Sequence, residues 1–120
     1  MATVLVVDDD PDIRELESMA LAFDGFEVLT ASDGQEALRV LSTRQPCVIV
    51  LDLMMPGMDG LTFLAERQKR SLGERIPVVC VSAAGRDMMS MAERLGAKDC
   101  VSKPIELDAF VACVRSYCSK

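Results

Sequence analysis

The chain has 120 residues, of which 50% are hydrophobic, and its formal net charge at pH 7 is −6. This length predicts one domain, residues 1–120, with enough apolar side chains to bury a core, and it argues against disorder. The acidic charge, with Lys and Arg scattered along the chain, argues against direct binding to nucleic acid or to an anionic membrane. No signal peptide or membrane span is visible, so we expect a cytoplasmic location.

Short apolar runs rich in Val and Ile alternate along the chain with longer segments of helical periodicity. This alternation predicts a doubly wound α/β fold in which five parallel strands are separated by five helices. The predicted strands are residues 3–7, 27–30, 47–51, 77–81 and 99–101.

The predicted helices begin at polar caps and bury one apolar face each. The first is capped by Asp10, begins at Pro11 and ends at Asp24 and Gly25, and its expected face is Ile13, Leu16, Met19 or Ala20, and Phe23. The second starts at Ser32 and Asp33 and stops before Pro46, with Ala37, Leu38 and Leu41 inward. The third covers residues 59–69, with Leu61, Leu64 and Ala65 inward. The fourth, ending at Gly96, buries Met88, Met91, Ala92 and Leu95 but not Met89, and the last buries Leu107, Phe110 or Val111, and Val114.

Acidic residues lie where predicted strands end, namely Asp8, Asp9 and Asp10 after the first strand and Asp52 after the third. The carboxyl ends of parallel strands open onto one crevice, so these side chains are expected to meet there. Clustered carboxylates repel one another unless they hold a cation. A ligand set made only of oxygen atoms favours Mg²⁺, or Mn²⁺, over Zn²⁺. The pattern therefore predicts a metal site.

Five cysteines occur at no spacing typical of a metal site. Two of them fall in or next to apolar strand-like runs. We interpret all five as reduced packing residues. They are Cys47, Cys80, Cys100, Cys113 and Cys118.

Four segments taken together, residues 6–11, 51–60, 81–83 and 96–104, resemble the receiver domain of two-component response regulators, the CheY-like family. The resemblance covers essentially the whole chain. It implies a flavodoxin-like (βα)5 fold with strand order 2-1-3-4-5. It also implies a signalling module that is not a turnover enzyme, because such a domain catalyses only its own phosphotransfer and dephosphorylation.

The resemblance assigns a role to each residue of the predicted crevice. Asp52 would be the phosphoacceptor, receiving a phosphoryl group from a histidine kinase or a histidine phosphotransfer protein. Mg²⁺ would be held by Asp9, Asp52 and the backbone carbonyl of Met54, with Asp8 acting through a water. Lys103, joined to Pro104 by a cis bond, and Ser82 would contact phosphoryl oxygens, and movement of Ser82 would be part of the switch.

Three positions depart from the pattern common in that family. Cys100 stands where many receivers carry an aromatic switch residue, so we expect the output change either to be smaller or to be carried by the helix at residues 88–95. Met54 and Ala84 stand where hydrolysis of the acyl phosphate is often tuned, and neither can orient a water by hydrogen bonding. We therefore predict a long-lived phosphoryl group. The signal is expected to pass to a downstream protein or to an output domain outside this sequence.

Other interpretations of the same residues remain. Asp8, Asp10 and Asp12 mimic the opening of a calcium loop, but Ile13 and Met19 replace its Gly and Glu, which excludes that site. Asp8 and Asp10 resemble the nucleophile and acid of haloacid-dehalogenase-type phosphatases. A pseudo-receiver that binds partners without being phosphorylated is the third alternative.

Overall fold

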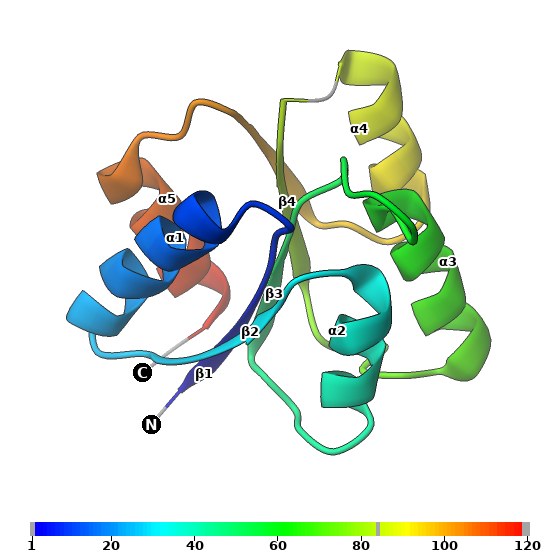
Figure 1. The fold of residues 1–120 in the computed structure, drawn as a ribbon, viewed down its shortest axis with the longest axis horizontal. Helices are drawn as coiled ribbons and strands as arrows, with labels where there is room; N and C mark the ends of the chain where they lie inside the picture. The colour runs from blue at the N-terminus through cyan, green and yellow to red at the C-terminus, as the bar shows by residue number, and fades with distance from the viewer. Residues whose placement is uncertain (1, 84, 119–120) are drawn as a thin grey trace.

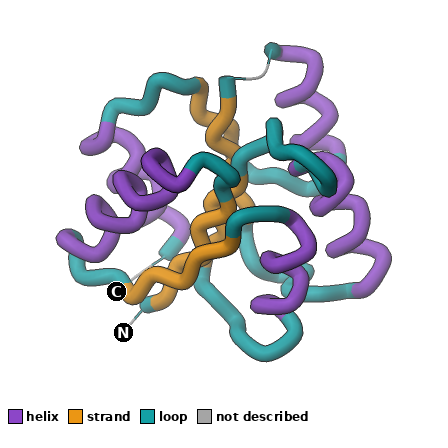
Figure 2. The backbone as a smooth tube through the Cα atoms, viewed as in Figure 1, coloured by secondary structure: helices purple, strands orange, loops and turns teal. Residues whose placement is uncertain are grey.

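Parallel strands and helices alternate through the computed structural model, which describes residues 2–83 and 85–118 (Figure 1). Helices cover both faces of the sheet, with α1 and α5 on one side and α2, α3 and α4 on the other. Figure 2 shows the same layers by type of secondary structure. Within the described residues the elements are β1 (Thr3–Val7), α1 (Pro11–Phe23), β2 (Glu27–Ala31), α2 (Gly34–Leu41), β3 (Val48–Leu51), α3 (Gly60–Arg70), β4 (Val78–Ser82), α4 (Arg86–Arg94), β5 (Asp99–Ser102) and α5 (Leu107–Tyr117).

The strands of the described chain form one parallel sheet in the order β2-β1-β3-β4-β5, which confirms the predicted fold class and strand order. β3 therefore occupies the centre, hydrogen-bonded to β1 on one side and β4 on the other. The register pairs Val7 with Leu51, the last residues of β1 and β3. The residues that follow these two strands consequently lie side by side at one edge of the sheet.

The core consists of two layers, one on each face of the sheet. Side chains alternate between the faces along each strand, so Leu5 and Ile49 point toward α2, α3 and α4, whereas Val4 and Val48 point toward α1 and α5. Phe63 anchors the first layer, and Phe110 anchors the second. Both aromatic side chains are essentially fully buried, which fixes α3 and α5 against opposite faces.

The predicted strand boundaries agree with the structure to within one residue. The caps also act as expected, because the carboxylates of Asp10 and Asp33 accept hydrogen bonds from backbone N–H groups at the starts of α1 and α2. Asp59 caps α3 in the same way. α2 ends at Leu41, and the segment before Pro46 is a turn and loop.

The predicted buried face of α1 is wrong. Leu16, Met19 and Phe23 are exposed to 48%, 63% and 96%, whereas Glu17 and Leu21 are buried. Apolar residues occur all around this helix, so hydrophobic periodicity alone does not select one face, and a glutamate does not signal burial.

Two other helices bury a different side chain from the one predicted. In α3, Phe63 and Leu64 are buried and Ala65 is exposed. In α4, Met89 packs against the core and Met91 is 50% exposed, the reverse of the prediction. Alanine carries little apolar surface, and adjacent methionines give no directional signal, so tertiary packing decides both faces. The buried faces of α2 and α5 agree with the prediction.

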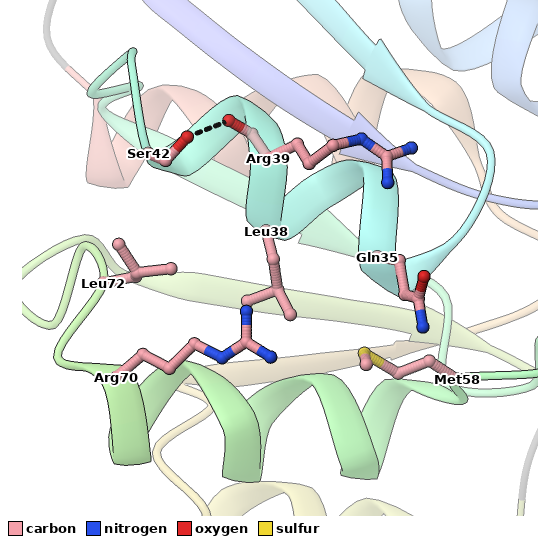
Figure 3. A pocket seen from close by; sticks show the side chains of 7 residues that line it. All are labelled: Gln35, Leu38, Arg39, Ser42, Met58, Arg70 and Leu72. Carbon is pink, nitrogen blue, oxygen red and sulfur yellow. Dashed lines mark hydrogen bonds between the residues drawn. The ribbon is translucent and has the colours of Figure 1, made fainter.

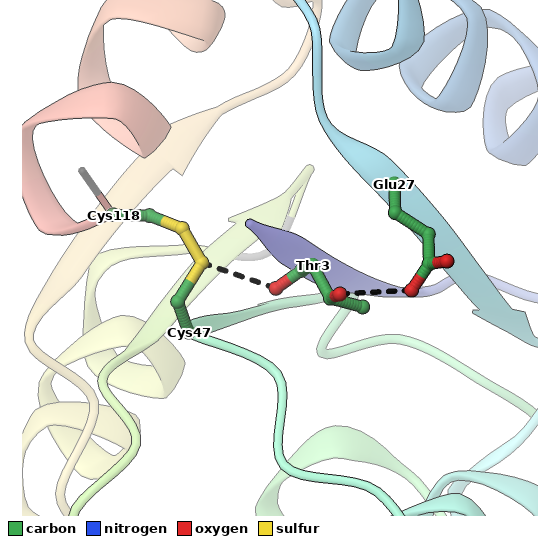
Figure 4. The surroundings of a disulfide bond; sticks show 4 residues. All are labelled: Thr3, Glu27, Cys47 and Cys118. Carbon is green, nitrogen blue, oxygen red and sulfur yellow. Dashed lines mark hydrogen bonds between the residues drawn. A yellow bond between two sulfur atoms is a disulfide. The ribbon is translucent and has the colours of Figure 1, made fainter. Parts of the chain in front are cut away.

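The interpretation of all five cysteines as reduced is also wrong. Cys47, which precedes β3, and Cys118, which follows α5, are joined by a disulfide with a Cα–Cα distance of 5.4 Å (Figure 4). These residues are 71 positions apart in the sequence, so only the fold brings them together. Cys80, Cys100 and Cys113 are the free cysteines of the described chain.

A hollow of about 350 Å³ lies between α2 and α3 (Figure 3). Apolar side chains form part of its wall, and Arg39 and Arg70 lie at its rim. Among the described residues, no helix combines the length and the apolar character needed to cross a membrane.

Candidate functional site

The carboxyl edge of β1 and β3 brings three carboxylates together. The N–H of Asp8 donates to the carbonyl oxygen of Ala31 at 3.1 Å, and the N–H of Asp52 donates to that of Val7 at 2.9 Å. These bonds extend the ladders of the sheet and so fix both backbones. One oxygen each of Asp8, Asp9 and Asp52 lies within 4.8 Å of the others. Three of the four residues that the sequence predicted to meet therefore do so, whereas the carboxylate of Asp10 caps α1.

Asp52 is 5% exposed and Asp8 is 1% exposed, while Asp9 faces solvent. Burial raises the pKa of Asp52, and the negative charge of Asp8 raises it further. A hydrogen bond from the N–H of Met54, at 3.1 Å, and the charge of Lys103 act in the opposite direction. The carboxylate of Asp52 is thus withdrawn from water but retains groups that stabilise its ionised form.

Lys103 reaches into this cluster from the loop after β5. Its Nζ donates to Oδ2 of Asp8 at 3.1 Å and lies 3.6 Å from Oδ2 of Asp52. The N–H of Lys103 donates to the carbonyl of Ser82 at 3.0 Å, and the bond from Lys103 to Pro104 is cis. Burial lowers the pKa of Lys103, but the hydrogen bond that Lys103 donates to Asp8 and the charge of Asp52 outweigh it, so the net pKa is raised.

This donor set suits a hard divalent cation. Three ionised carboxylates and one ammonium leave two negative charges, which one divalent cation would balance. The ligand atoms are all oxygen, the type that Mg²⁺ and Mn²⁺ prefer. Asp9 is exposed and would leave room for water ligands, which Mg²⁺ usually keeps.

The loop between β3 and α3 is packed tightly against the cluster. The N–H of Gly60 donates to the carbonyl of Leu53 at 3.0 Å. A Cβ atom at Gly60 would lie 2.6 Å from the Cα of Leu53 and 2.9 Å from the carbonyl oxygen of Asp52. Glycine therefore allows the loop to approach closely. Met54, two residues after Asp52, has a side chain that is 56% exposed.

The remaining predicted residues lie on β4 and β5. Ser82 ends β4, the neighbour of β3, and is fully buried at the same edge of the sheet. Cys100 lies in β5, beside Cys80 of β4, and its Sγ donates to the carbonyl of Met89 in α4 at 3.8 Å. Cys100 is therefore outside the carboxylate cluster but in contact with α4. Ala84 lies outside the described residues.

Two residues near the cluster were not predicted. Arg14 donates from Nη1 to the carbonyl oxygen of Asp8 at 2.8 Å. Glu17 is 1% exposed, and its Oε2 has no hydrogen-bond partner among the described residues. Burial, followed by the charge of Asp8, raises the pKa of Glu17 to about 7. Both residues lie on a helix, where the sequence gives no signal that separates them from solvent-facing charges.

Comparison with known proteins identifies the family of this chain. The family model for the response regulator receiver domain matches residues 4–115. The chain belongs to the response regulator receiver domain family. Among curated relatives, response regulator MprA of Mycolicibacterium vanbaalenii is 41% identical over 118 residues, covering 94% of this chain and 48% of the relative. The receiver domain thus spans about half the length of the curated relatives it matches.

Solved structures place the receiver domain with the same family. Chemotaxis protein CheY4 of Vibrio cholerae superposes with a TM-score of 0.90 at 30% identity, covering 98% of both chains. The receiver domain of Francisella response regulator 1452 gives 0.88 at 30% identity, covering 98% of this chain and 96% of that one. NtrX of Brucella abortus gives 0.88 at 35% identity, where 98% of this chain matches 27% of the longer protein. The likeness therefore extends over the whole receiver fold.

Proposed function

We propose that residues 1–120 form a receiver domain in which Asp52 accepts a phosphoryl group from a phosphohistidine, carried by a histidine kinase or a histidine phosphotransfer protein. The observation that carries this proposal is the position of Asp52. Its carboxylate is buried at the end of the central strand, within 4.8 Å of oxygens of Asp8 and Asp9 and 3.6 Å from Nζ of Lys103. A nucleophile, a cation site and a fixed ammonium are thus combined in one crevice.

In this mechanism, an oxygen of Asp52 attacks phosphorus, the bond from phosphorus to the histidine nitrogen breaks, and an aspartyl phosphate forms. Asp9, Asp52 and the backbone carbonyl of Met54 would hold Mg²⁺, with Mn²⁺ as a substitute and Asp8 acting through a water. Bound Mg²⁺ would offset negative charge on the transferring oxygens. Lys103 would exchange its contact with Asp8 for one with a phosphoryl oxygen.

Ser82 and β5 would convert this chemistry into a signal. The Ser82 side chain would move to hydrogen-bond a phosphoryl oxygen, and the carbonyl of Ser82 already accepts from the N–H of Lys103. Both residues would therefore respond to the same phosphoryl group. Their response would shift the equilibrium between two conformations of this part of the domain. Cys100 contacts α4, so α4 is the helix we expect to shift.

A partner could dock beside the crevice. Lys103 and Pro104 form one wall of an apolar hollow of about 430 Å³, and Ile13 and Leu16 of α1 form the other. A phosphohistidine on a partner helix seated there would lie next to Lys103. Because NtrX and the MprA relatives are longer than this chain, we propose that the signal passes to an output domain or to a separate cytoplasmic protein.

The test is the intact mass of the protein after incubation with Mg²⁺ and either acetyl phosphate or phosphoramidate. We expect one phosphoryl group on the wild type and none on Asp52→Ala or in the presence of a chelator. Asp59→Ala, which removes the cap of α3, is the matched control and should still be phosphorylated. Absence of phosphate on folded wild type would favour a pseudo-receiver instead.

The phosphatase alternative has little support from the geometry. The carboxylate of Asp10 accepts from the N–H groups of Asp12 and Ile13 and so caps α1, which leaves it poorly placed as a general acid for Asp8. Turnover of a phosphomonoester that is lost in Asp8→Ala and retained in Asp52→Ala would reverse this conclusion.

A further inference from the structure

The disulfide between Cys47 and Cys118 lies at the amino end of β3, at the opposite end of the strand from the phosphorylation crevice. Cys47 immediately precedes β3, whereas Asp52 immediately follows it. Figure 4 shows the bond linking the start of β3 to the end of α5. The Cα–Cα distance of 5.4 Å is in the range that unstrained disulfide geometry requires. The fold therefore positions these two cysteines for a bond without moving the backbone.

The pair can be reached from solvent through one of its members. Cys118 is 1% exposed and packs in the apolar layer under α1 and α5. Cys47 is only partly buried. Thiol–disulfide exchange requires access to at least one sulfur atom. Cys47 is consequently the residue at which a small thiol or disulfide would react.

The reduced form also fits the fold. The Sγ of Cys47 lies 3.1 Å from the carbonyl oxygen of Thr3, so a thiol at this position has a hydrogen-bond acceptor (Figure 4). A thiol at Cys118 would remain among apolar side chains, where free cysteine behaves as a small hydrophobic residue. The surroundings of the two side chains are therefore compatible with either oxidation state.

Few other side-chain bonds hold the last turn of α5 among the described residues. Arg115 pairs with Asp24 at 2.6 Å, but the arginine side chain is 52% exposed, and such surface pairs contribute little. The hydroxyl of Tyr117 donates to Asp99 at 3.4 Å. Phe110 and Val114, which are buried, hold the earlier turns. The disulfide is therefore the strongest link at the end of the helix.

We propose that Cys47 and Cys118 form a reversible thiol–disulfide switch that fastens the last turn of α5 to β3 when oxidised and releases it when reduced. A small disulfide such as oxidised glutathione is the oxidant. The Cys47 thiolate attacks it, displacing one glutathione thiolate and giving a mixed disulfide. The Cys118 thiolate then attacks the Cys47 sulfur and displaces the second. The two cysteines lose two electrons and two protons, and two molecules of reduced glutathione form.

The first experiment equilibrates the protein at graded ratios of reduced to oxidised glutathione, quenches with acid, and alkylates the denatured chain. The mass should show five alkylated cysteines at the reducing end and three at the oxidising end, because Cys80, Cys100 and Cys113 are free. Cys113→Ser, on the same helix, should keep the transition with one label fewer. Five labels at every ratio, a bond mapped to another pair, or a bond that persists under fully reducing conditions would overturn the proposal.

The second experiment measures amide hydrogen exchange of residues 113–118 at the two ends of the same titration. We expect exchange roughly tenfold faster in the reduced protein, since local opening no longer has to break a covalent link. Cys47→Ser and Cys47→Ala should exchange at the fast rate under both conditions. Equal rates in oxidised and reduced wild type would contradict release of α5. No phosphodonor is present, so the result does not depend on phosphorylation of Asp52.

Discussion

Glu17 places a fourth carboxyl group close to the charged cluster, in the interior of the protein. One of its oxygens has no hydrogen-bond partner in the part of the chain that the structure describes. Burial, followed by the charge of Asp8, raises the pKa of Glu17 to about 7 from a reference value of 4.5, against the opposing charge of Lys103. An acid whose folded pKa exceeds its unfolded pKa binds more protons in the folded state. Its ionisation therefore costs stability, and this cost grows as pH rises from about 4.5 to 7 and is complete above that window.

We predict that Glu17→Leu increases the free energy of unfolding at pH 8 by up to about 3 kcal/mol and by much less near pH 5. The measurement is urea unfolding at both pH values, with a chelator present so that cations do not shift the balance of charge. Glu15→Leu, on the exposed side of the same helix, is the matched control and should change little. A gain that is equal at both pH values would show that packing, not ionisation, is responsible.

We expect Met54 to influence the lifetime of the proposed aspartyl phosphate at Asp52. Its side chain is 56% exposed beside the crevice and cannot orient a water by hydrogen bonding. We predict that Met54→Asn shortens the half-life of the phosphorylated protein, because an amide at this position can direct a water toward phosphorus.

The half-life is followed by intact mass after removal of phosphoramidate. Met91→Asn changes an exposed methionine of α4 and should leave the decay unaltered. An unchanged half-life in Met54→Asn would refute the assignment of Met54 to this role.

Among the helices, α4 has the fewest fully buried residues. Ala92 is its buried residue, and its start at Gly85 has no side-chain cap. Its contact with β5 includes the hydrogen bond from Cys100 to the carbonyl of Met89. The thiol of Cys100 cannot fill or vacate the volume of an aromatic ring. Movement of this side chain would therefore drive only a small rearrangement of β5. The response to phosphorylation should therefore appear in the helix.

We predict that phosphorylation changes amide exchange in residues 85–96 more than in β5. The comparison is between wild type treated with Mg²⁺ and acetyl phosphate and Asp52→Ala treated identically. Amide exchange in α2 serves as the internal reference. This helix follows β2 at one edge of the sheet, whereas Ser82 ends β4, which lies near the other edge. Equal protection of α4 before and after phosphorylation would count against this pathway.

The elements themselves were predictable because strands and capped helices have local signatures. Short apolar runs between segments of helical periodicity located the strands. Asp10 and Asp33 marked where helices begin. The direction in which α1 faces the sheet was not predictable. Its apolar residues surround the helix, and one of its two buried positions is taken by Glu17, whose burial depends on neighbours from other parts of the chain.

On the scale of the whole molecule, strand topology explains which features of the site were visible in the sequence. Asp8, Asp9 and Asp52 each follow a strand, so a parallel sheet suffices to bring them together. The link between Cys47 and Cys118 follows no such rule, since 71 positions separate the two residues and their meeting depends on how α5 packs across the sheet.

The proposed docking of a phosphodonor protein would depend on the surface beside the crevice. We predict that Leu16→Asp lowers the rate of phosphotransfer from a histidine phosphotransfer protein by about tenfold or more, because it places a charge in the apolar hollow beside Lys103. Phosphorylation by acetyl phosphate should be unchanged, since a small donor needs no docking surface. Phe23→Asp, at the far end of α1 and 96% exposed, is the control. Equal losses with both donors would indicate damage to the crevice.

The central position of β3 has a consequence for how information moves through this protein. Every residue of β3 is buried, and the strand is bonded on both sides, so it deforms less readily than any edge strand. Asp52 extends from that strand and cannot travel toward its partners. On phosphorylation, we therefore expect Lys103 and the loop after β3 to move toward a carboxylate that itself moves little. Phosphorylation would then occur at a buried part of the sheet that is paired on both sides, and the response would appear in the loops and helices around it.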